Sequence, residues 1–364
     1  HVGIDLYRCL NSKRLRGLSR RRFETWVRGC GVSAPIVYMD HHEAHLASAY
    51  YTSEWNECLA ISIDGVGDGY CSRIAVCKNG QMDLVHAMPF YHTPGQYYGF
   101  VTGWAGFRAG RHEGKITGLA AHGDPNKVIE IFRNRISYSE RKFSFVNHGR
   151  WGWAEFEALS RELDGHDRSD VAAGVQKHLE DLVAQYVAQA VETYGPRKVA
   201  LSGGIFANVK LNQRIRQLDC VDDVFVHPNM GDGGLALGSA LTLASHRSHL
   251  APARLDNVYL GASVAEREIE GELSRVGLPF SRHQDVESEI ASLLAAGQVV
   301  ARVNGPMEYG PRALGNRSIL YQATDVTVND WLNKKLRRTE FMPFAPAILA
   351  ERAEAYYVDY PISS

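Results

Sequence analysis

Two segments in the second half of the chain repeat one local pattern, in which a short apolar strand leads into a glycine-rich loop and then into a helix. Residues 199–201 lead into 202–208, and residues 224–226 lead through 228–230 into 231–238. Such loops let backbone N–H groups approach an anion closely, and the N-terminus of the next helix adds a favourable potential. The pattern predicts two anion-binding loops. The alternative for each loop is a tight turn that needs glycine for its backbone angles.

The first half of the chain shows the signals of a β-hairpin beside an acidic turn. Residues 58–63 read as a buried strand that ends in a turn rich in aspartate and glycine, residues 64–69. Two further strands are expected at residues 71–77 and 82–88. They are joined through Asn79-Gly80, a dipeptide typical of hairpin turns.

The later elements include a long helix and a change of composition. Residues 170–193 carry an apolar stripe at helical spacing, which predicts core packing. The composition loosens over residues 250–257, where a domain boundary is expected. Beyond it the sequence predicts a capped helix from Ser263, a helix over residues 286–296 and a strand over residues 299–303.

Composition limits the number of domains and the class of partner. The 364 residues are 45% hydrophobic and 22% charged, which allows a large core and suggests two domains. A net charge of −1 predicts no general attraction to nucleic acid or membranes. The basic residues 13–22 are expected to form a solvated face, with a nucleic-acid contact as the alternative. The six scattered cysteines fit reduced, small buried hydrophobes in the cytoplasm.

A pair of histidines gives the first sign of a metal site. His41 and His45 are four residues apart, so on a helix their rings share one face and can converge on an ion. Asp40 is a natural N-cap, and Glu43 at the third helical position completes a capping-box pattern. The alternative is a surface pair or a satisfied core pair.

Taken together and in order, seven motifs resemble the O-carbamoyltransferases of nodulation-factor and antibiotic biosynthesis. These enzymes are relatives of the universal tRNA threonylcarbamoyl transferase. The motifs are HHEAH (41–45), IDGVGDG (63–69), GKITGLAAHG (114–123), LSGGIFAN (201–208), GDGGLALG (231–238), GPRALGNRSIL (310–320) and FMPFAP (341–346).

The resemblance implies an α/β fold class and two domains. Residues 1–250 are expected to form an actin-like, sugar-kinase-like ATPase domain, similar to threonylcarbamoyl transferase and lacking its first strand. Residues 257–364 are expected to form the first part of an incomplete YrdC-like α/β domain. The implied reaction converts carbamoyl phosphate and ATP to carbamoyl adenylate. The carbamoyl group then passes to a hydroxyl of a small acceptor, such as a sugar, an antibiotic or a Nod-factor-like molecule.

The resemblance also implies a metal centre. His41 and His45 would bind a divalent, iron-type ion, with Asp232 as the third ligand and Asp64 as a fourth candidate. Asp64 and Asp232 would also be catalytic. Imidazole and carboxylate ligands with open positions suit Fe(II) acting as a Lewis acid. Mg(II) could accompany the ATP.

The nucleotide would be lined by Gly203, Gly204 and Asn208, with Lys115 and Gly118 closing over it. Lys115 could equally be a surface lysine.

Carbamoyl phosphate would be bound in the second domain by Arg312 and Arg317, because guanidinium groups meet phosphate oxygens in pairs. Arg338 is a weaker candidate, which gains weight because Met342 stands where many relatives have arginine. Each arginine could instead be a surface or ion-pair residue.

Two alternative functions stay open, a tRNA threonylcarbamoyl transferase and a non-catalytic nucleotide-binding remnant. Family members begin upstream of this chain and continue beyond it, so weak or no activity is expected from these residues alone. The acceptor surface is expected in variable loops. One candidate is the aromatic stretch around Tyr97, Tyr98, Phe100 and Trp104, which could also be core.

Overall fold

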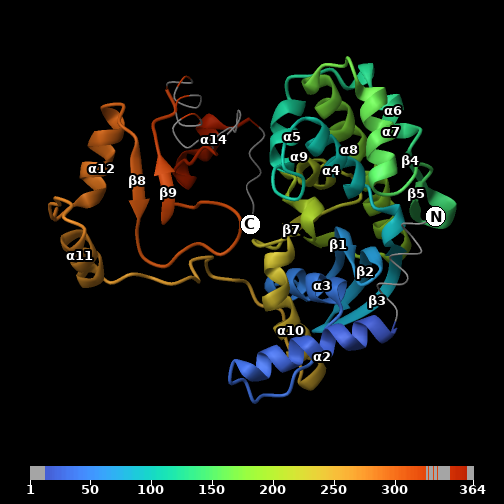
Figure 1. Cartoon of the computed structure of the whole chain (residues 1–364), viewed down its shortest axis with the longest axis horizontal. Helices are drawn as coiled ribbons and strands as arrows, with labels where there is room; N and C mark the ends of the chain where they lie inside the picture. Colours follow the sequence, from blue (N-terminus) through green and yellow to red (C-terminus); the bar gives the residue numbers. More distant parts are fainter. Residues whose placement is uncertain (1–12, 325–326, 328–330, 332–333, 335–344, 359–364) are drawn as a thin grey trace. The chain divides into compact units, whose positions relative to one another are not determined.

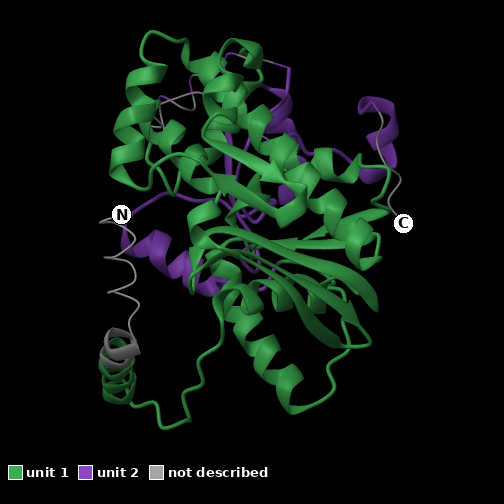
Figure 2. Ribbon diagram, turned by 90° about the vertical axis from the view of Figure 1, so that its right-hand side faces the viewer, with its two compact units in different colours: residues 1–258, 309–312 green, residues 259–308, 313–364 purple. Residues whose placement is uncertain are grey.

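The computed structural model describes residues 13–324, 327, 331, 334 and 345–358. Contacts divide the chain into two compact units, coloured in Figure 2. Unit 1 comprises His1–Val258 and Tyr309–Arg312, and unit 2 comprises Tyr259–Glu308 and Ala313–Ser364. Among the described residues, no helix combines the length and the apolar character needed to cross a lipid bilayer.

Unit 1 is built on a mixed five-stranded sheet with the strand order β3-β2-β1-β6-β7 (Figure 1). The first three strands form an antiparallel meander, and β6 and β7 run parallel to β1. The strands are β1 (Glu57–Gly67), β2 (Tyr70–Lys78), β3 (Gln81–Pro89), β6 (Lys198–Ser202) and β7 (Asp223–Val226).

Helices pack on both faces of this sheet, so the predicted α/β class is confirmed. A small hairpin, β4 (Ile136–Ser139) with β5 (Ser144–Asn147), lies outside it. The α-helices of unit 1 are α2 (Lys13–Gly29), α3 (His41–Thr52), α4 (Gly95–Trp104), α5 (Glu113–Ala120), α6 (Ile129–Arg133), α7 (Trp153–Leu163), α8 (Arg168–Tyr194), α9 (Val209–Arg216) and α10 (Leu235–Arg247).

Strand β1 separates two buried clusters because successive side chains point to opposite faces. Leu59 and Ile61 belong to the larger cluster, which includes the apolar residues of α8. Cys58 and Ala60 belong to the smaller cluster, which includes Tyr50 and its neighbours on α3. These small side chains let α3 lie close to the sheet, so the helix with the predicted metal ligands sits beside the end of β1.

Helix α10 approaches α3 closely at one glycine. A Cβ on Gly238 would lie 1.9 Å from the backbone oxygen of Ala44, a distance that no side chain could tolerate. The turn η5 (Asp232–Gly234) leads directly into α10. The contact at Gly238 therefore brings Asp232 to the beginning of α3.

Several predicted elements are confirmed, with some changes in extent. The hairpin strands and α8 are found where they were predicted. Strand β1 is longer than predicted and continues to Gly67, past a register shift after Ile63. The helix predicted from Ser263 begins three residues later. Tyr97 and Tyr98 are buried in the larger cluster, which supports the core alternative for these two rings.

The described cysteines are free thiols, and they follow the prediction only in part. Cys58, Cys71 and Cys77 are buried, as expected of small hydrophobes, but Cys30 is exposed and Cys220 is half-buried.

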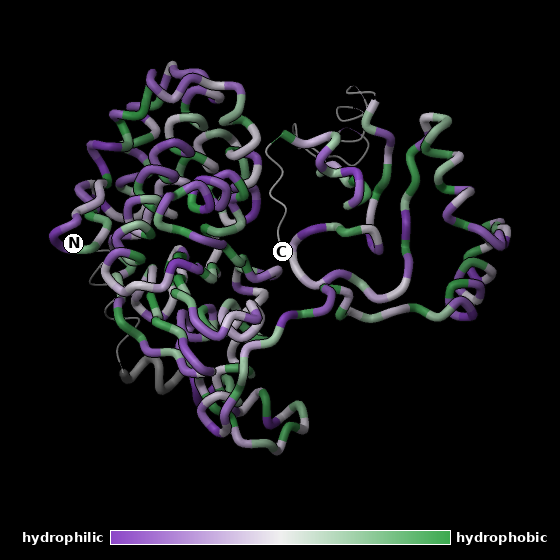
Figure 3. The backbone as a smooth tube through the Cα atoms, turned by 180° about the vertical axis from the view of Figure 1, so that it is seen from behind, coloured by the Kyte–Doolittle hydropathy of each residue, from purple (hydrophilic) through white to green (hydrophobic). Residues whose placement is uncertain are grey.

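Unit 2 has fewer regular elements in its described part. Figure 3 shows hydrophobic residues along strand β8, although Val303 on that strand is 62% exposed. The elements are α11 (Glu266–Arg275), α12 (Val286–Ala295), β8 (Val300–Val303), β9 (Arg317–Leu320) and α14 (Ala353–Tyr356), with β8 and β9 antiparallel.

Candidate metal and nucleotide site

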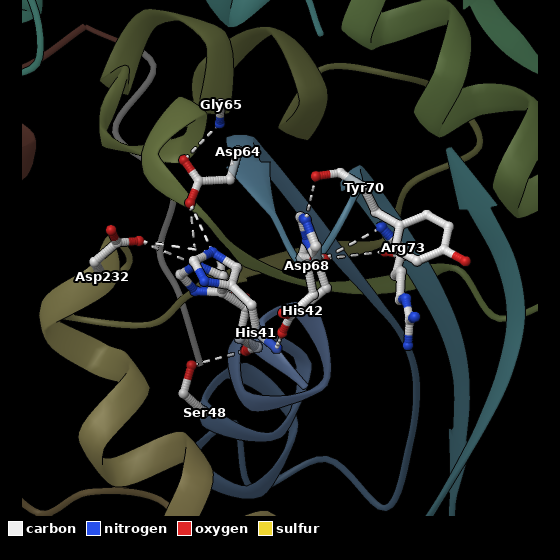
Figure 4. A network of polar contacts seen from close by, with 12 residues as sticks. His41, His42, Ser48, Asp64, Gly65, Asp68, Tyr70, Arg73 and Asp232 are labelled. Atoms are coloured by element: carbon white, nitrogen blue, oxygen red, sulfur yellow. Dashed lines mark hydrogen bonds and ion pairs between the residues drawn. The ribbon is translucent and has the colours of Figure 1, made fainter. Parts of the chain in front are cut away.

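Four side chains from three parts of the sequence meet at the start of α3. Figure 4 shows His41 of α3 facing Asp64 on β1 and Asp232 before α10. His45, one turn further along α3, contacts the same two carboxylates. One possible ligand atom from each lies within 4.8 Å of the others. The structure thus brings together the four residues that the sequence assigned to one metal ion.

The distances between these atoms suit a metal site. Asp64 Oδ2 lies 3.1 Å from His41 Nε2 and 3.3 Å from His45 Nε2, and Asp232 Oδ1 lies 3.7 Å from each ring. Ligands at about 2.1 Å from a tetrahedral ion are separated by roughly 3.4 Å. Asp64, predicted as the fourth ligand, is the nearer carboxylate. His45 is fully buried and Asp232 is 74% exposed, so the site opens on the Asp232 side.

Two aspartates fix the first turn of α3. The carboxylate of Asp40 accepts a hydrogen bond from the backbone N–H of Glu43, so the predicted N-cap is confirmed. Asp68 accepts one from the N–H of His41 at 2.9 Å. The Glu43 carboxylate lies 3.2 Å from His246 rather than closing a capping box. Sequence reasoning missed Asp68 because its partner is a backbone group 27 residues away.

A glycine on β1 leaves room for the ring of His41. A Cβ on Gly67 would lie 2.1 Å from His41 Cδ2. Any side chain at this position would displace the ring from Asp64 and Asp232. The IDGVGDG motif therefore contributes the Asp64 carboxylate, the Asp68 hydrogen bond to the first turn of α3, and the space at Gly67 that the His41 ring occupies.

The charges in the cluster stabilise one another. Burial by itself raises the pKa of Asp64, but its hydrogen bonds with His41 and His45 hold that pKa well below its usual range. Burial lowers the pKa of His45, and the carboxylates of Asp232 and Asp64 outweigh burial and raise it. Nδ1 of His45 is buried without a hydrogen-bond partner among the described residues. A buried polar atom without a partner costs about 1–3 kcal/mol, and the cluster does not offset this cost, because its carboxylates face Nε2.

His42, between the two candidate ligands, has a different role. Its Nε2 donates to the backbone oxygen of Tyr70 at 3.0 Å, and its Nδ1 lies 2.9 Å from the hydroxyl of Ser62. Burial lowers the pKa of His42 to about 4. Both ring nitrogens are bonded within the fold, so His42 anchors α3 to the sheet.

The first predicted anion loop, residues 202–208, lies directly against the group formed by His41, His45, Asp64 and Asp232. Gly203 has a φ of +102°, and a Cβ there would lie 2.2 Å from the backbone oxygen of Ile63. A Cβ on Gly204 would lie 3.0 Å from Asp64 Oδ1. The backbone N–H of Gly203 donates to Met230 in the second predicted loop at 2.6 Å. Both glycine loops are thus in contact with each other beside the cluster.

Asn208 is bonded within the protein. Its Oδ1 accepts from the backbone N–H of Leu211 and so caps α9, and its Nδ2 donates to Gln176 on α8 at 2.8 Å. The same Gln176 accepts from the hydroxyl of Tyr98, which lies 2.8 Å from Thr117 Oγ1 on α5. Asn208 therefore connects the loop to α8 and α5.

Lys115 and Gly118 lie on α5, on either side of Thr117. Lys115 is 6% exposed, and its ammonium lies 4.9 Å from the centre of the Phe107 ring. The alternative of a surface lysine is therefore wrong. A role for α5 in closing over a nucleotide remains a prediction.

The predicted phosphate-binding arginines lie in different surroundings. Arg312 was expected in the second domain but groups with unit 1, where its guanidinium donates to the backbone oxygen of Ala207 at 3.2 Å. Arg317 lies in unit 2, where its guanidinium donates to four backbone oxygens. Arg338 lies outside the described residues. The acceptors of Arg317 are Ala262, Asn304, Gly305 and Asn316.

The backbone around Arg317 is held by a buried carboxylate. Oε1 of Glu308 accepts hydrogen bonds from the N–H groups of Leu314, Asn316 and Arg317, at 2.7–2.9 Å. The bond from Arg317 contributes most to lowering the pKa of Glu308 to about 2. The GPRALGNRSIL motif is therefore folded around its own Arg317 and the preceding Glu308, while Arg312 remains at an exposed position.

The buried His227 predicts a pH dependence of stability. Burial lowers the pKa of His227 from 6.5 to about 4. The unfolded chain therefore binds a proton that the folded protein rejects, and the free energy of unfolding should fall as the pH decreases from 6.5 to 4. The full effect is about 3 kcal/mol. Denaturant titrations between pH 7 and 4 would measure it, and His227→Gln should flatten the curve. If the free energy of unfolding depended on pH in the same way in the unmodified chain and in His227→Gln, His227 would not be the group responsible.

Comparisons with known proteins agree with the motifs. Residues 28–241 match the family model described as "Carbamoyltransferase N-terminus", and residues 291–363 match "Carbamoyltransferase C-terminus". "Nodulation protein NolNO" of Sinorhizobium fredii is 31% identical over 94% of this chain and 51% of its own length. "Nodulation protein NolO" of Bradyrhizobium diazoefficiens is 32% identical over 88% of this chain and 60% of its own length.

The chain thus spans little more than half the length of these relatives. A crystal structure of full-length HypF in a phosphate- and nucleotide-bound form covers 60% of this chain and 44% of its own, with 18% identity and a TM-score of 0.34. That similarity is too low to support an argument. The family models and the nodulation proteins confirm the resemblance seen in the motifs, and the chain belongs to the carbamoyltransferase family.

Proposed function

We propose that this chain belongs to a cytoplasmic enzyme that transfers a carbamoyl group from carbamoyl phosphate to a hydroxyl of a small molecule through carbamoyl adenylate. The adenylate would form from carbamoyl phosphate, water and ATP with release of phosphate and pyrophosphate, and the transfer would release AMP. Unit 1 would carry out the transfer with an actin-like ATPase fold. The YrdC-like domain, which begins in the later residues, would form the adenylate. The observation that carries the proposal is the contact between the candidate metal ligands and the glycine loop at residues 202–208. In this contact, Gly204 lies against Asp64.

This adjacency suits a transfer from a nucleotide to an alcohol. A neutral hydroxyl is a weak nucleophile, so the carbamoyl group needs a good leaving group, which AMP provides in the mixed anhydride. The loop at Gly203 and Gly204 would hold the adenylate through the backbone N–H of Gly204, since the N–H of Gly203 already donates to Met230. The carbamoyl carbon would then face His41, His45, Asp64 and Asp232.

The residues present fit a divalent ion, with Fe(II) proposed from the ligand types. Such an ion, when bound, would act as a Lewis acid on the carbamoyl carbonyl. Asp64 anchors the cluster, because its Oδ2 faces both histidines while its Oδ1 accepts from the N–H of Gly65 at 2.7 Å. The more exposed Asp232 lies where the acceptor hydroxyl would enter and could take its proton.

Of the two described arginines proposed for carbamoyl phosphate, Arg312 has the stronger support. The guanidinium of Arg317 is directed to backbone oxygens, so it contributes to the shape of the loop. Arg312 makes one such bond and is exposed, which leaves donors for a phosphate. Arg338 would supplement it.

The test is the release of pyrophosphate from ATP when carbamoyl phosphate is added to the complete natural polypeptide with Fe(II) and Mg(II). Release that depends on carbamoyl phosphate is the expected result. A control without carbamoyl phosphate measures the background. No release above that background, with nucleotide binding intact, would favour a non-catalytic nucleotide-binding protein instead.

A further inference from the structure

A buried hydrogen-bond relay connects the residue Tyr309 to the helix that carries the metal candidates. His227 follows β7, is fully buried and lies between two hydroxyl groups. Its Nε2 is 3.1 Å from the hydroxyl of Tyr309, and its Nδ1 is 3.0 Å from Oγ1 of Thr52 on α3. We call Tyr309, His227 and Thr52 the His227 relay. All three residues belong to unit 1.

The direction of the relay follows from its last bond. The hydroxyl of Thr52 donates to the backbone oxygen of Ser48 at 2.6 Å, so its only proton is used. Thr52 Oγ1 must therefore accept from His227, which places the ring proton on Nδ1. Nε2 then holds a lone pair, and the hydroxyl of Tyr309 donates to it.

One end of the relay holds the segment that contains Arg312. The backbone N–H of Tyr309 donates to the backbone oxygen of Val258 at 2.6 Å. Gly310 has a φ of +114°, and a Cβ there would lie 2.6 Å from the backbone oxygen of Pro228. Arg312 follows two residues later and donates to Ala207, next to the glycine loop. The hydroxyl of Tyr309 is thus one of several contacts that seat this segment.

The other end of the relay lies in α3, within two turns of His45. The backbone oxygen of His45 accepts from the hydroxyl groups of Ser48 and Ser202, at 2.7 and 2.6 Å. Thr52 continues the same face of the helix through its bond to Ser48. The segment with Arg312 is therefore tied to the same helix as the metal candidates.

We propose that Tyr309 and His227 are positioning residues that hold Arg312 in place beside the glycine loop. The proposal rests on the proposed function, in which Arg312 binds carbamoyl phosphate. Neither residue touches the substrate. The hydroxyl of Tyr309 acts by restricting where the guanidinium of Arg312 can lie.

Tyr309→Phe tests the proposal, because it removes one hydroxyl and keeps the ring. In the complete polypeptide we expect the KM for carbamoyl phosphate to rise about tenfold, because the hydroxyl loses its hydrogen bonds to His227 and to the side chain of Asn229. The kcat should change less than twofold, and the metal content should not change. Tyr138→Phe is the matched control, since its half-buried hydroxyl also donates to a side chain, Gln189. A kinetic effect of Tyr138→Phe equal to that of Tyr309→Phe would overturn the proposal.

Two substitutions at His227 separate the two ends of the relay. The amide oxygen of glutamine can take the place of Nε2 and accept from Tyr309, whereas asparagine reaches only the position of Nδ1. We expect His227→Gln to keep the KM within about twofold and His227→Asn to match Tyr309→Phe. A larger rise in KM for His227→Gln than for His227→Asn would contradict the proposal that Tyr309 donates to Nε2 of His227.

Two measurements on the 364-residue chain do not depend on activity. Nitrogen NMR at pH 7 should show the ring proton of His227 on Nδ1. The backbone amide hydrogen of residue 309 should exchange with solvent faster in the Tyr309→Phe variant than in the unmodified chain. A proton on Nε2, or unchanged exchange, would overturn the relay. If the complete polypeptide releases no pyrophosphate, the proposed function fails, and these two results still decide whether the relay exists.

Discussion

Replacing His45 by alanine should abolish the binding of a divalent metal ion and leave the fold of unit 1 largely intact. The buried ring directs Nε2 toward both Asp64 and Asp232, so the substitution removes a ligand atom from the closed side of the site. Alanine favours helix, and the loss of the ring should cost a few kcal/mol at most. Elemental analysis after reconstitution with Fe(II), together with circular dichroism, measures both effects. Unchanged metal stoichiometry would rule out the site.

His42→Ala is the matched control for this experiment. His42 lies on the same helix and is equally buried, but its ring nitrogens face Ser62 and Tyr70. The variant should lose about 1–3 kcal/mol of unfolding free energy, because it leaves buried partners without a hydrogen bond. It should still bind the metal. An equal loss of metal in both variants would mean that damage to α3, rather than a lost ligand, explains the result.

Local patterns in the sequence were sufficient to predict much of unit 1. The hairpin followed from alternating apolar residues around Asn79-Gly80, and α8 followed from its apolar stripe. The end of β1 was less predictable. Its aspartates and glycines favour a turn, yet the strand continues to Gly67 because it pairs with Tyr70 after a register shift. Pairing between strands therefore outweighed local preference there.

The candidate site was predictable in its members but not in its geometry. The family motifs named His41, His45, Asp64 and Asp232, which the structure brings together. Their meeting depends on close backbone contacts, such as that of Gly238 with α3, which no short pattern encodes. The same holds for the His227 relay, whose members come from three distant segments. Long-range packing decides such contacts, and a single sequence does not display it.

Arg312→Ala should strongly slow the formation of carbamoyl adenylate and spare the transfer of the carbamoyl group from preformed carbamoyl adenylate. The guanidinium would meet phosphate oxygens in pairs, and hydrogen bonds to a charged group contribute about 1.5–3 kcal/mol. We therefore expect kcat/KM for pyrophosphate release to fall about 100-fold in the complete polypeptide. Arg312→Lys keeps the positive charge but loses the planar guanidinium group. Its kcat/KM should therefore lie between those of the unmodified enzyme and of Arg312→Ala.

Arg302→Ala provides the control for the loss of an arginine side chain elsewhere, here a half-buried one in unit 2. Arg302 lies on β8 and pairs with the exposed Glu287 at 3.0 Å, a contact that contributes little to stability. Its substitution should leave both half-reactions unchanged. Equal loss of adenylate formation and of transfer in Arg312→Ala would contradict a separate activation step. It would instead indicate that Arg312, which lies against the glycine loop through Ala207, acts on the nucleotide in unit 1.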